Sequence, residues 1–279
     1  MASLFALFSS LLWGSADFEG GRLSKKHAPI AVLGFSQIVG LIFGLVIVAI
    51  KGDSGATALG AHGYLIPGIC AGFLGYFGLA CLYAGLAAGR MGVVSPISAL
   101  SAVIPLSYAI GHGEKLSSIT TAGVVLALSG AFCSSGPEIS SGLTLRPLLL
   151  ALGAAFGFGT ALTFIAIGSQ SSALMTMVTM RAATVGVTLM LAIRYRSTGG
   201  FTKREYPRLV FMGVADFLAN LLLGIACNAG SVSVAMVLGS LYPIATAVMA
   251  YKFLHERLRR VQYVGIVLAV SGVALISAF

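Results

Sequence analysis

Charged residues are nearly absent from long stretches of this chain, and this constrains its fold more than any other feature. Only 9% of its 279 residues are charged and 58% are hydrophobic, whereas about 25% of an ordinary soluble domain is charged. A helix that crosses a membrane needs about 20 apolar residues, so a chain of this length has room for roughly ten such helices and little else. The composition therefore predicts an all-α polytopic membrane protein without a soluble domain.

Charged or Gly/Ser-rich clusters divide the chain into ten apolar segments, which we number as spans 1 to 10. The predicted spans are residues 3–22, 30–50, 63–88, 93–111, 118–135, 147–168, 172–193, 207–228, 231–253 and 259–279. The connections between them are too short to form domains. We therefore expect a single membrane unit, with five helices in residues 1–135, a connecting loop at 136–146 and five helices in residues 147–279.

An internal repeat relates the two halves of the chain. The segment Gly92–Pro105 (GVVSPISALSAVIP) aligns with Gly230–Pro243 (GSVSVAMVLGSLYP) at a constant offset of 138 residues. A second block, Gly113–Ala131, aligns with His255–Val273 at an offset of 142 residues. Because each half contains an odd number of spans, the two copies must cross the membrane in opposite directions. The sequence thus predicts two inverted five-helix repeats, an arrangement found in many secondary transporters.

Basic residues are distributed unequally between the two sides of the predicted membrane unit. The loops that follow the odd-numbered spans hold 14 of them, namely Arg22, Lys25, Lys26, Arg90, Arg146, Arg194, Arg196, Lys203, Arg204, Arg208, Lys252, Arg257, Arg259 and Arg260. The opposite side has only Lys51 and Lys115. Because cytoplasmic loops carry an excess of Lys and Arg, this split places both termini outside the cytoplasm, in an inner or plasma membrane. We interpret the formal net charge of +9 as a topology signal and not as a nucleic-acid-binding surface.

The sequence lacks the residue patterns of an enzyme or a metal site. The four Cys residues fall singly in apolar runs without CxxC spacing, and none of the four His residues has a second His at ligand spacing. Phosphate-binding GxxxxGK[ST] and nucleophile GxSxG motifs are also missing. We therefore expect no metal, no cofactor and no enzymatic activity. Two alternatives to a transporter stay open: an integral membrane enzyme that acts on a lipid or a small metabolite, and a channel.

Ionisable residues within the predicted spans are the first candidates for a functional site, because such residues are rare inside a bilayer. Asp17, Arg181 and Asp216 lie in spans 1, 7 and 8. The last two lie near the midplane on consecutive spans, so we expect them to pair. The pair is either a static salt bridge or a site where Arg181 binds a substrate carboxylate or Asp216 exchanges a proton. Glu19, three residues from Arg22, is expected to form an interfacial ion pair.

Polar and aromatic residues extend this candidate site. Asn220 lies one helical turn after Asp216 and therefore on the same face. Trp13 and Tyr83 are candidates to line a cavity that accepts flat or cationic solutes through stacking and cation–π contacts. Further aromatic candidates of the same kind are Tyr76, Phe156 and Tyr242.

Two prolines occupy matching positions in spans 4 and 9. Each of them, Pro105 and Pro243, removes one backbone hydrogen bond and permits a kink in its helix. Both readings stay open, a hinge that moves during function and a static bend.

Several of these motifs are similar to those of a known transporter family. LLWGSADF opens span 1, TMRAATVG surrounds Arg181, and GEKL…G…SGA is paired with HERL…G…SGV. Together they resemble the EamA family of the drug/metabolite transporter superfamily, over nearly the whole chain. The resemblance implies a carrier of two inverted five-helix repeats around a central cavity, with spans 5 and 10 at the periphery. It also implies export or exchange of small metabolites or drugs, often against protons.

The chain departs from the family pattern in two respects. Gln37 stands near the place where the second half has Arg181, so the family's mid-span arginine is present in one copy only. Family members usually keep both termini in the cytoplasm, which opposes the charge count of this chain. The family's paired glutamates correspond to Glu114 and Glu256, which lie in loops beside basic residues, and we expect them to secure helix ends.

Cysteine labelling tests the orientation of the chain. In a variant without the four native cysteines, Ser3→Cys should react with an impermeant reagent from outside, and Thr198→Cys only from the cytoplasmic side. The reason is that cytoplasmic loops retain the basic residues. Labelling of position 3 from the cytoplasm alone would reverse the predicted orientation.

Overall fold

The computed structural model describes residues 1–52, 56–60, 62–88, 97–134, 145–195, 199–254 and 259–278. The described residues form helices and connecting turns, without a strand among them. The elements are α1 (Ala2–Ser24), α2 (Pro29–Lys51), α3 (Leu65–Ala88), η1 (Leu100–Ala102), α5 (Val103–Gly111), α6 (Ser118–Ser134), α7 (Leu145–Tyr195), α8 (Tyr206–Ala229), α9 (Val232–Gly239), α10 (Tyr242–Leu254) and α11 (Arg260–Ala278). The described part therefore agrees with the predicted all-α fold class.

Helix α7 contains 51 residues but is not one straight helix. A straight helix of this length would measure about 75 Å, more than twice the thickness of the hydrocarbon core of a bilayer. The backbone of Ser172 is non-helical (φ −159°, ψ 117°) and breaks α7 into two parts that correspond to predicted spans 6 and 7. The Ser172 hydroxyl accepts a hydrogen bond from the Met175 backbone N–H at 3.1 Å, as an N-cap of the second part.

Predicted span 9 corresponds to one apolar stretch, Val232–Phe253, that is long enough to cross a membrane, but its helix is interrupted. It consists of α9 and α10, which are interrupted at Ser240 and Leu241, just before Pro243. In span 4 the first residues, 93–96, lie outside the described part, and the 3₁₀ turn η1 precedes α5 and Pro105. The irregular turns therefore occupy matching places in the two halves, each followed by a proline that lacks a backbone N–H. The hinge role of the two prolines stays a prediction.

Five helices of the described part are long and apolar enough to cross a membrane. They are Pro29–Lys51, Leu65–Leu82, Leu148–Arg194, Tyr206–Ala229 and Val232–Phe253, and shorter apolar helices accompany them. Large apolar side chains of these helices, such as Ile42 and Phe73, are exposed on the outside of the molecule. Side chains of this kind are compatible with lipid and not with water, so the chain is an integral membrane protein.

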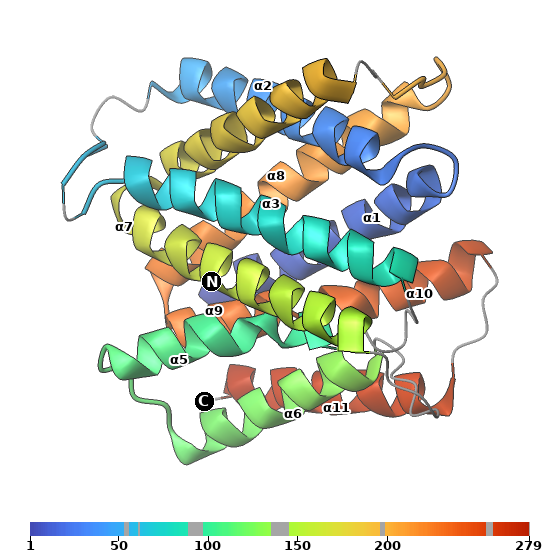
Figure 1. Cartoon of the computed structure of the whole chain (residues 1–279). Helices are drawn as coiled ribbons and strands as arrows, with labels where there is room; N and C mark the ends of the chain where they lie inside the picture. Colours follow the sequence, from blue (N-terminus) through green and yellow to red (C-terminus); the bar gives the residue numbers. More distant parts are fainter. Residues whose placement is uncertain are drawn as a thin grey trace.

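Successive helices run in alternating directions when the two parts of α7 are counted separately and α9 is counted together with α10, and both ends of the chain lie at the same end of the helices (Figure 1). Helix α1 packs against α8 and α10, and α7 packs against α3 and α5. Both sets of contacts are close at glycines. A Cβ atom on Gly14 of α1 would lie 2.5 Å from the Cβ atom of Ala245 in α10, and one on Gly159 of α7 would lie 2.5 Å from the carbonyl oxygen of Ser101. The pairs of helices in contact, and not the individual glycines, correspond between the two halves, as an inverted repeat would produce.

Helices α6 and α11 lie side by side at one edge of the molecule (Figure 1). A Cβ on Gly123 of α6 would meet Ile276, and one on Gly265 of α11 would meet Ser134. The two contacts are related by the sequence offset of 142, so each helix uses the same small-residue face against the other. This edge position agrees with the periphery that the family resemblance implies for spans 5 and 10.

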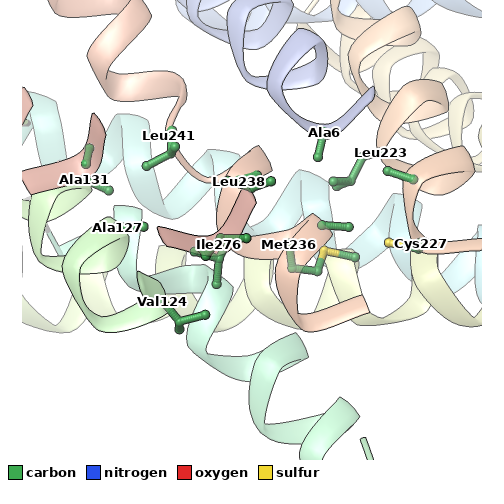
Figure 2. Packing of buried hydrophobic residues seen from close by; sticks show 14 of the residues in the cluster. Ala6, Val124, Ala127, Ala131, Leu223, Cys227, Met236, Leu238, Leu241 and Ile276 are labelled. Carbon is green, nitrogen blue, oxygen red and sulfur yellow. The ribbon is translucent and has the colours of Figure 1, made fainter. Parts of the chain in front are cut away.

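The largest cluster of buried apolar residues joins this edge to the rest of the molecule. Figure 2 shows Val124 of α6 and Ile276 of α11 beside Leu238 and Met236 of α9, with Ala6 of α1 on the other side. Helix α9 is therefore enclosed by helices of both halves. Helix α9 has only eight residues, and most of them are buried among other helices. A helix in this place need not be long enough to cover the lipid core, because its side chains do not face lipid.

The close approach of α1 to α10 predicts the effect of adding one methyl group. Gly14→Ala places a Cβ 2.5 Å from Ala245 Cβ and 2.7 Å from the Tyr242 carbonyl oxygen. The helices must separate, and we expect a loss of about 1–3 kcal/mol in the free energy of unfolding. The measurement is the thermal unfolding midpoint in detergent.

Gly21→Ala is the matched control in the same helix. Nothing lies within 4 Å of a Cβ at Gly21, so this change should be neutral or raise the unfolding midpoint slightly, since alanine favours a helix over glycine. Equal loss from both variants would contradict the close packing of α1 on α10.

Candidate functional site

The sequence expectation that Arg181 and Asp216 pair is confirmed. In the second part of α7, the NH2 nitrogen of Arg181 lies 2.7 Å from Oδ2 of Asp216 in α8. Arg181 is only 3% exposed, and the side chain of Asp216 is 24% exposed. The contact is an ion pair by distance, but Nε and NH2 of Arg181 donate no hydrogen bond within the described part of the chain. The guanidinium group therefore keeps donor capacity beyond this pair.

The amide oxygen of Gln37 in α2 forms the second contact of the guanidinium group. The NH1 nitrogen of Arg181 donates a hydrogen bond to Gln37 Oε1, and the Thr184 hydroxyl donates to the same oxygen at 3.0 Å. Two donors on one oxygen fix the orientation of the amide group. A Cβ atom on Gly40 would lie 3.4 Å from Nε of Arg181, so the glycine leaves room for the arginine side chain.

Gln37 is a site residue that the sequence did not select as a candidate. The available signal was its position, because Gln37 aligns with Arg181 between the two halves. Residues that correspond in an inverted repeat can contact each other only close to the pseudo-two-fold axis. In the inverted arrangement that the sequence predicts, the contact between Gln37 and Arg181 would place the ion pair near this axis, between helices of both halves.

The carboxylate of Asp216 has two further donors. The indole Nε1 of Trp13 in α1 donates to Asp216 Oδ1 at 3.0 Å, and Nδ2 of Asn220 donates to the same oxygen at 3.2 Å. Asn220 also donates to the backbone carbonyl of Asp216 at 2.7 Å. The predicted residues Trp13, Arg181 and Asn220 thus all contact the fourth predicted residue, Asp216.

Asp17 lies close to this cluster without being part of its hydrogen bonds. It follows Trp13 by one turn of α1, and its side chain is exposed, whereas the neighbouring Ala16 and Phe18 are buried. Its charge and that of Asp216 are near enough to repel each other. Tyr242, at the start of α10, packs edge-on against Trp13 with a centroid distance of 6.3 Å. The region therefore combines two carboxyl groups, one guanidinium group and two aromatic rings.

Three other aromatic candidates lie elsewhere. Phe156 is 56% exposed on the outside of α7, so its prediction as a cavity residue is wrong. The hydroxyl of Tyr76 is buried, and this residue borders an apolar recess of about 350 Å³ between α2, α3 and α7, away from the ion pair. The side chain of Tyr83 lies outside the described residues. The rotation of each helix about its axis decides where its aromatic side chains lie, and this rotation cannot be predicted from composition.

Two glutamates expected to have structural roles do so. Glu19 accepts a hydrogen bond from Arg22 at 2.9 Å, as predicted, and lies 3.9 Å from Arg208. Glu114 accepts hydrogen bonds from the Ser231 hydroxyl and, at 3.2 Å, from the Ser233 backbone N–H. It therefore caps the first turn of α9 from the other half of the chain. Its repeat partner Glu256 falls outside the described part.

A comparison with protein families decides the class of this molecule. The model of the EamA-like transporter family matches residues 1–136 and 145–278, two stretches that together cover nearly the whole chain. The chain belongs to the EamA-like transporter family. This EamA-like transporter is thus a member of the drug/metabolite transporter superfamily, as its motifs indicated, and has a general transporter role. Its expected partners are a small-molecule substrate and membrane lipid.

The fold of the EamA-like transporter is similar to that of a solved crystal structure. That structure aligns with 99% of this chain and 96% of its own, at 16% sequence identity and a TM-score of 0.83. At this identity the similarity concerns the fold alone. No curated protein matches the sequence.

The buried ion pair predicts unequal effects of single and double substitutions. Arg181→Ala leaves Asp216 without its counter-charge and should lower the free energy of unfolding by about 3 kcal/mol. This is the low end of the loss that follows when one partner of a buried ion pair is removed. We expect Arg181→Ala with Asp216→Ala to be less damaging than the sum of the two single changes. The measurement is thermal unfolding in detergent for all four members of the cycle.

The control is the pair of Arg22 and Glu19 at the end of α1, whose arginine is far more exposed than Arg181. Arg22→Ala removes the partner of Glu19 where the arginine side chain is 34% exposed, and such pairs contribute about 0–1 kcal/mol. Strict additivity of the Arg181 and Asp216 changes would show that the two residues are not coupled.

Proposed function

We propose that this EamA-like transporter is a secondary carrier that exports small, partly apolar or amine-bearing metabolites by alternating access. Its ten predicted spans would form two inverted five-helix repeats, residues 1–135 and 147–279, with both termini outside the cytoplasm of an inner or plasma membrane. The observation that carries the proposal is the ion pair of Arg181 and Asp216, which contacts helices of both halves.

A site near the axis of an inverted repeat suits alternating access. Two halves of similar structure and opposite orientation can exchange conformations, so that the same site opens to one side and then to the other. Helices α2 and α7 each contribute a residue to the axis through Gln37 and Arg181. The broken helices α9 and α10, with Pro243 after the break, offer a place where the backbone can bend.

The charges of the site favour a cationic or zwitterionic substrate. Asp17 and Asp216 supply two carboxyl groups against the single guanidinium group of Arg181, so a protonated amine would balance the local charge. Trp13 and Tyr242 supply aromatic rings for a flat or cationic group. The N–H groups of Arg181 that donate no hydrogen bond within the described part could donate to the carboxylate of a zwitterion, such as an amino acid.

Proton coupling would use one of the two acids. A carboxylate that loses its guanidinium partner in a poorly hydrated site takes up a proton more readily. Asp216 is the better candidate for proton binding, since it lies near the middle of α8 and forms an ion pair with Arg181 that a proton could replace. Asp17 lies seven residues before the end of α1 and, being exposed, could guard the entrance to the site.

The competing classes make different predictions about transport. A carrier gives saturable counterflow, a channel gives conductance that does not saturate, and an enzyme forms product in detergent without vesicles. A thermal-shift screen against amino acids, quaternary amines and nucleosides supplies the substrate, because a ligand at 100 times its Kd stabilises the protein by about 2.7 kcal/mol.

Reconstitution into liposomes tests proton coupling. With a pH gradient and a substrate from the screen, uptake should follow the gradient in the wild type and become independent of it in Asp216→Asn. Asp17→Asn should lower the rate and keep the gradient dependence. Glu19→Gln is the control, since this acid pairs with Arg22 outside the site, and it should behave as wild type. Transport without pH dependence in every variant, the wild type included, would leave a facilitative carrier.

A further inference from the structure

A second polar cluster joins the two halves at the opposite end of the helices from the termini (Figure 1). Its centre is His27, between α1 and α2. The Nδ1 atom of His27 lies 3.1 Å from the carbonyl oxygen of Gly199, and its Nε2 atom lies 3.0 Å from Oε2 of Glu205, the residue before α8. The side chains of His27 and Glu205 are 13% and 12% exposed. The imidazole ring thus connects the α1–α2 turn to the segment that precedes α8.

Both partners of the His27 ring accept hydrogen bonds. The carbonyl group of Gly199 has no proton to donate. Glu205 is ionised, because the backbone N–H of Thr202, the His27 ring and the Thr202 hydroxyl all donate to it and lower its pKa to about 2. A neutral imidazole ring has one N–H group, whereas an imidazolium ring has two. Only the doubly protonated ring makes both contacts at once.

The backbone around the ring is shaped to present these acceptors. Gly199 and Gly200 have positive φ values of 90° and 64°, which side chains other than glycine rarely adopt. A Cβ on Gly199 would lie 2.5 Å from the ring of Phe201 and 2.9 Å from the Cβ of Ala31. The Phe201 ring lies 4.8 Å from the imidazole ring, between centroids. The Phe201 ring therefore packs against one side of the imidazole ring and limits its rotation.

We propose that His27 is a proton-binding site whose proton holds the α1–α2 turn against the segment before α8. We call His27, Gly199, Thr202 and Glu205 the His27 latch. With the proton bound, the latch joins the two halves on the face that carries the basic loops. When the proton leaves, one of the two ring contacts must break, and the two connections can separate. The proposal concerns residues distant from Arg181 and Asp216 and does not rest on the transport proposal.

The elements that form the latch carry other charged and titratable groups. They are Glu19, Arg22, Lys25 and Lys26 on the first connection, and Arg194 at the end of α7 with Lys203, Arg204, Tyr206 and Arg208 on the second. Glu19 pairs with Arg22 and Arg208, and the remaining cations are exposed, so salt screens their effect on the ring. Glu205 is the carboxylate in direct contact with His27.

The direction of the pH effect follows from these protonation states. The closed latch needs ionised Glu205 and protonated His27. It therefore forms above about pH 2, where Glu205 ionises, and it is lost when the His27 ring gives up its second proton. A rise in pH on this face should separate the two connections, whereas a fall in pH should hold them together.

Distances between spin labels test the latch in the full chain. Labels at Lys26→Cys and Lys203→Cys, in a background without the native cysteines, report the separation of the two connections in lipid nanodiscs. We expect one short distance at about pH 5.5 and a several-fold smaller short-distance population at about pH 8.5, pH values that bracket ordinary histidine titration. His27→Gln should give the long distance at both pH values.

Two further variants keep the test decisive. Glu205→Gln should lose the short distance at a lower pH than the wild type, because a neutral partner holds the imidazolium less strongly. His112→Gln is the matched control, since His112 is exposed and bonds to the Tyr108 carbonyl of its own helix at 2.8 Å. It should respond as wild type. A wild-type distance distribution that does not change with pH, or a normal pH response in His27→Gln, would overturn the proposal.

Discussion

The burial of one guanidinium group is the constraint on which the centre of this molecule depends. Arginine is always ionised, and placing it in the middle of a membrane protein costs several kcal/mol unless charge and hydrogen bonds compensate. Asp216 supplies the opposite charge and Gln37 an amide oxygen. Each is positioned in turn: Trp13 and Asn220 hold the carboxylate, and Thr184 holds the amide. The contacts that compensate the charge of Arg181 therefore connect helices α1, α2, α7 and α8.

The two halves of the chain share the same helix packing around this site, but they contribute different side chains to it. Packing at glycines is repeated between the halves, as at Gly123 and Gly265 in the α6–α11 pair. At the axis, however, a neutral Gln37 contacts a charged Arg181. In the proposed alternating-access cycle, the two states would be electrostatically unequal, because only one half carries the arginine. A substrate or a proton that competes for Asp216 would act directly on this difference.

Polar contacts outside the centre also join the halves, and they lie at opposite ends of the helices. Glu114 of the first half caps α9 of the second half near one end. His27 of the first half contacts Gly199 and Glu205 of the second half at the other end. Apolar contacts between helices have little directional preference, because lipid tails are as apolar as the side chains. The two polar contacts therefore add specific, directional links between the halves, one at each end of the helices.

The sequence by itself determined the features that depend on local pattern. Apolar length gave the helices, the constant offsets gave the repeat, and depth along consecutive spans gave the pairing of Arg181 with Asp216. Only the tertiary structure decided how each helix is rotated and where it is broken. Rotation turns Phe156 outward and Trp13 towards Asp216, and packing interrupts span 9 at Ser240. The sequence did not indicate the contacts of Gln37 and His27, because their partners are 144 and 178 residues away in the chain. A helical period reports which residues share a face, but the partner of that face is fixed by the assembled helices.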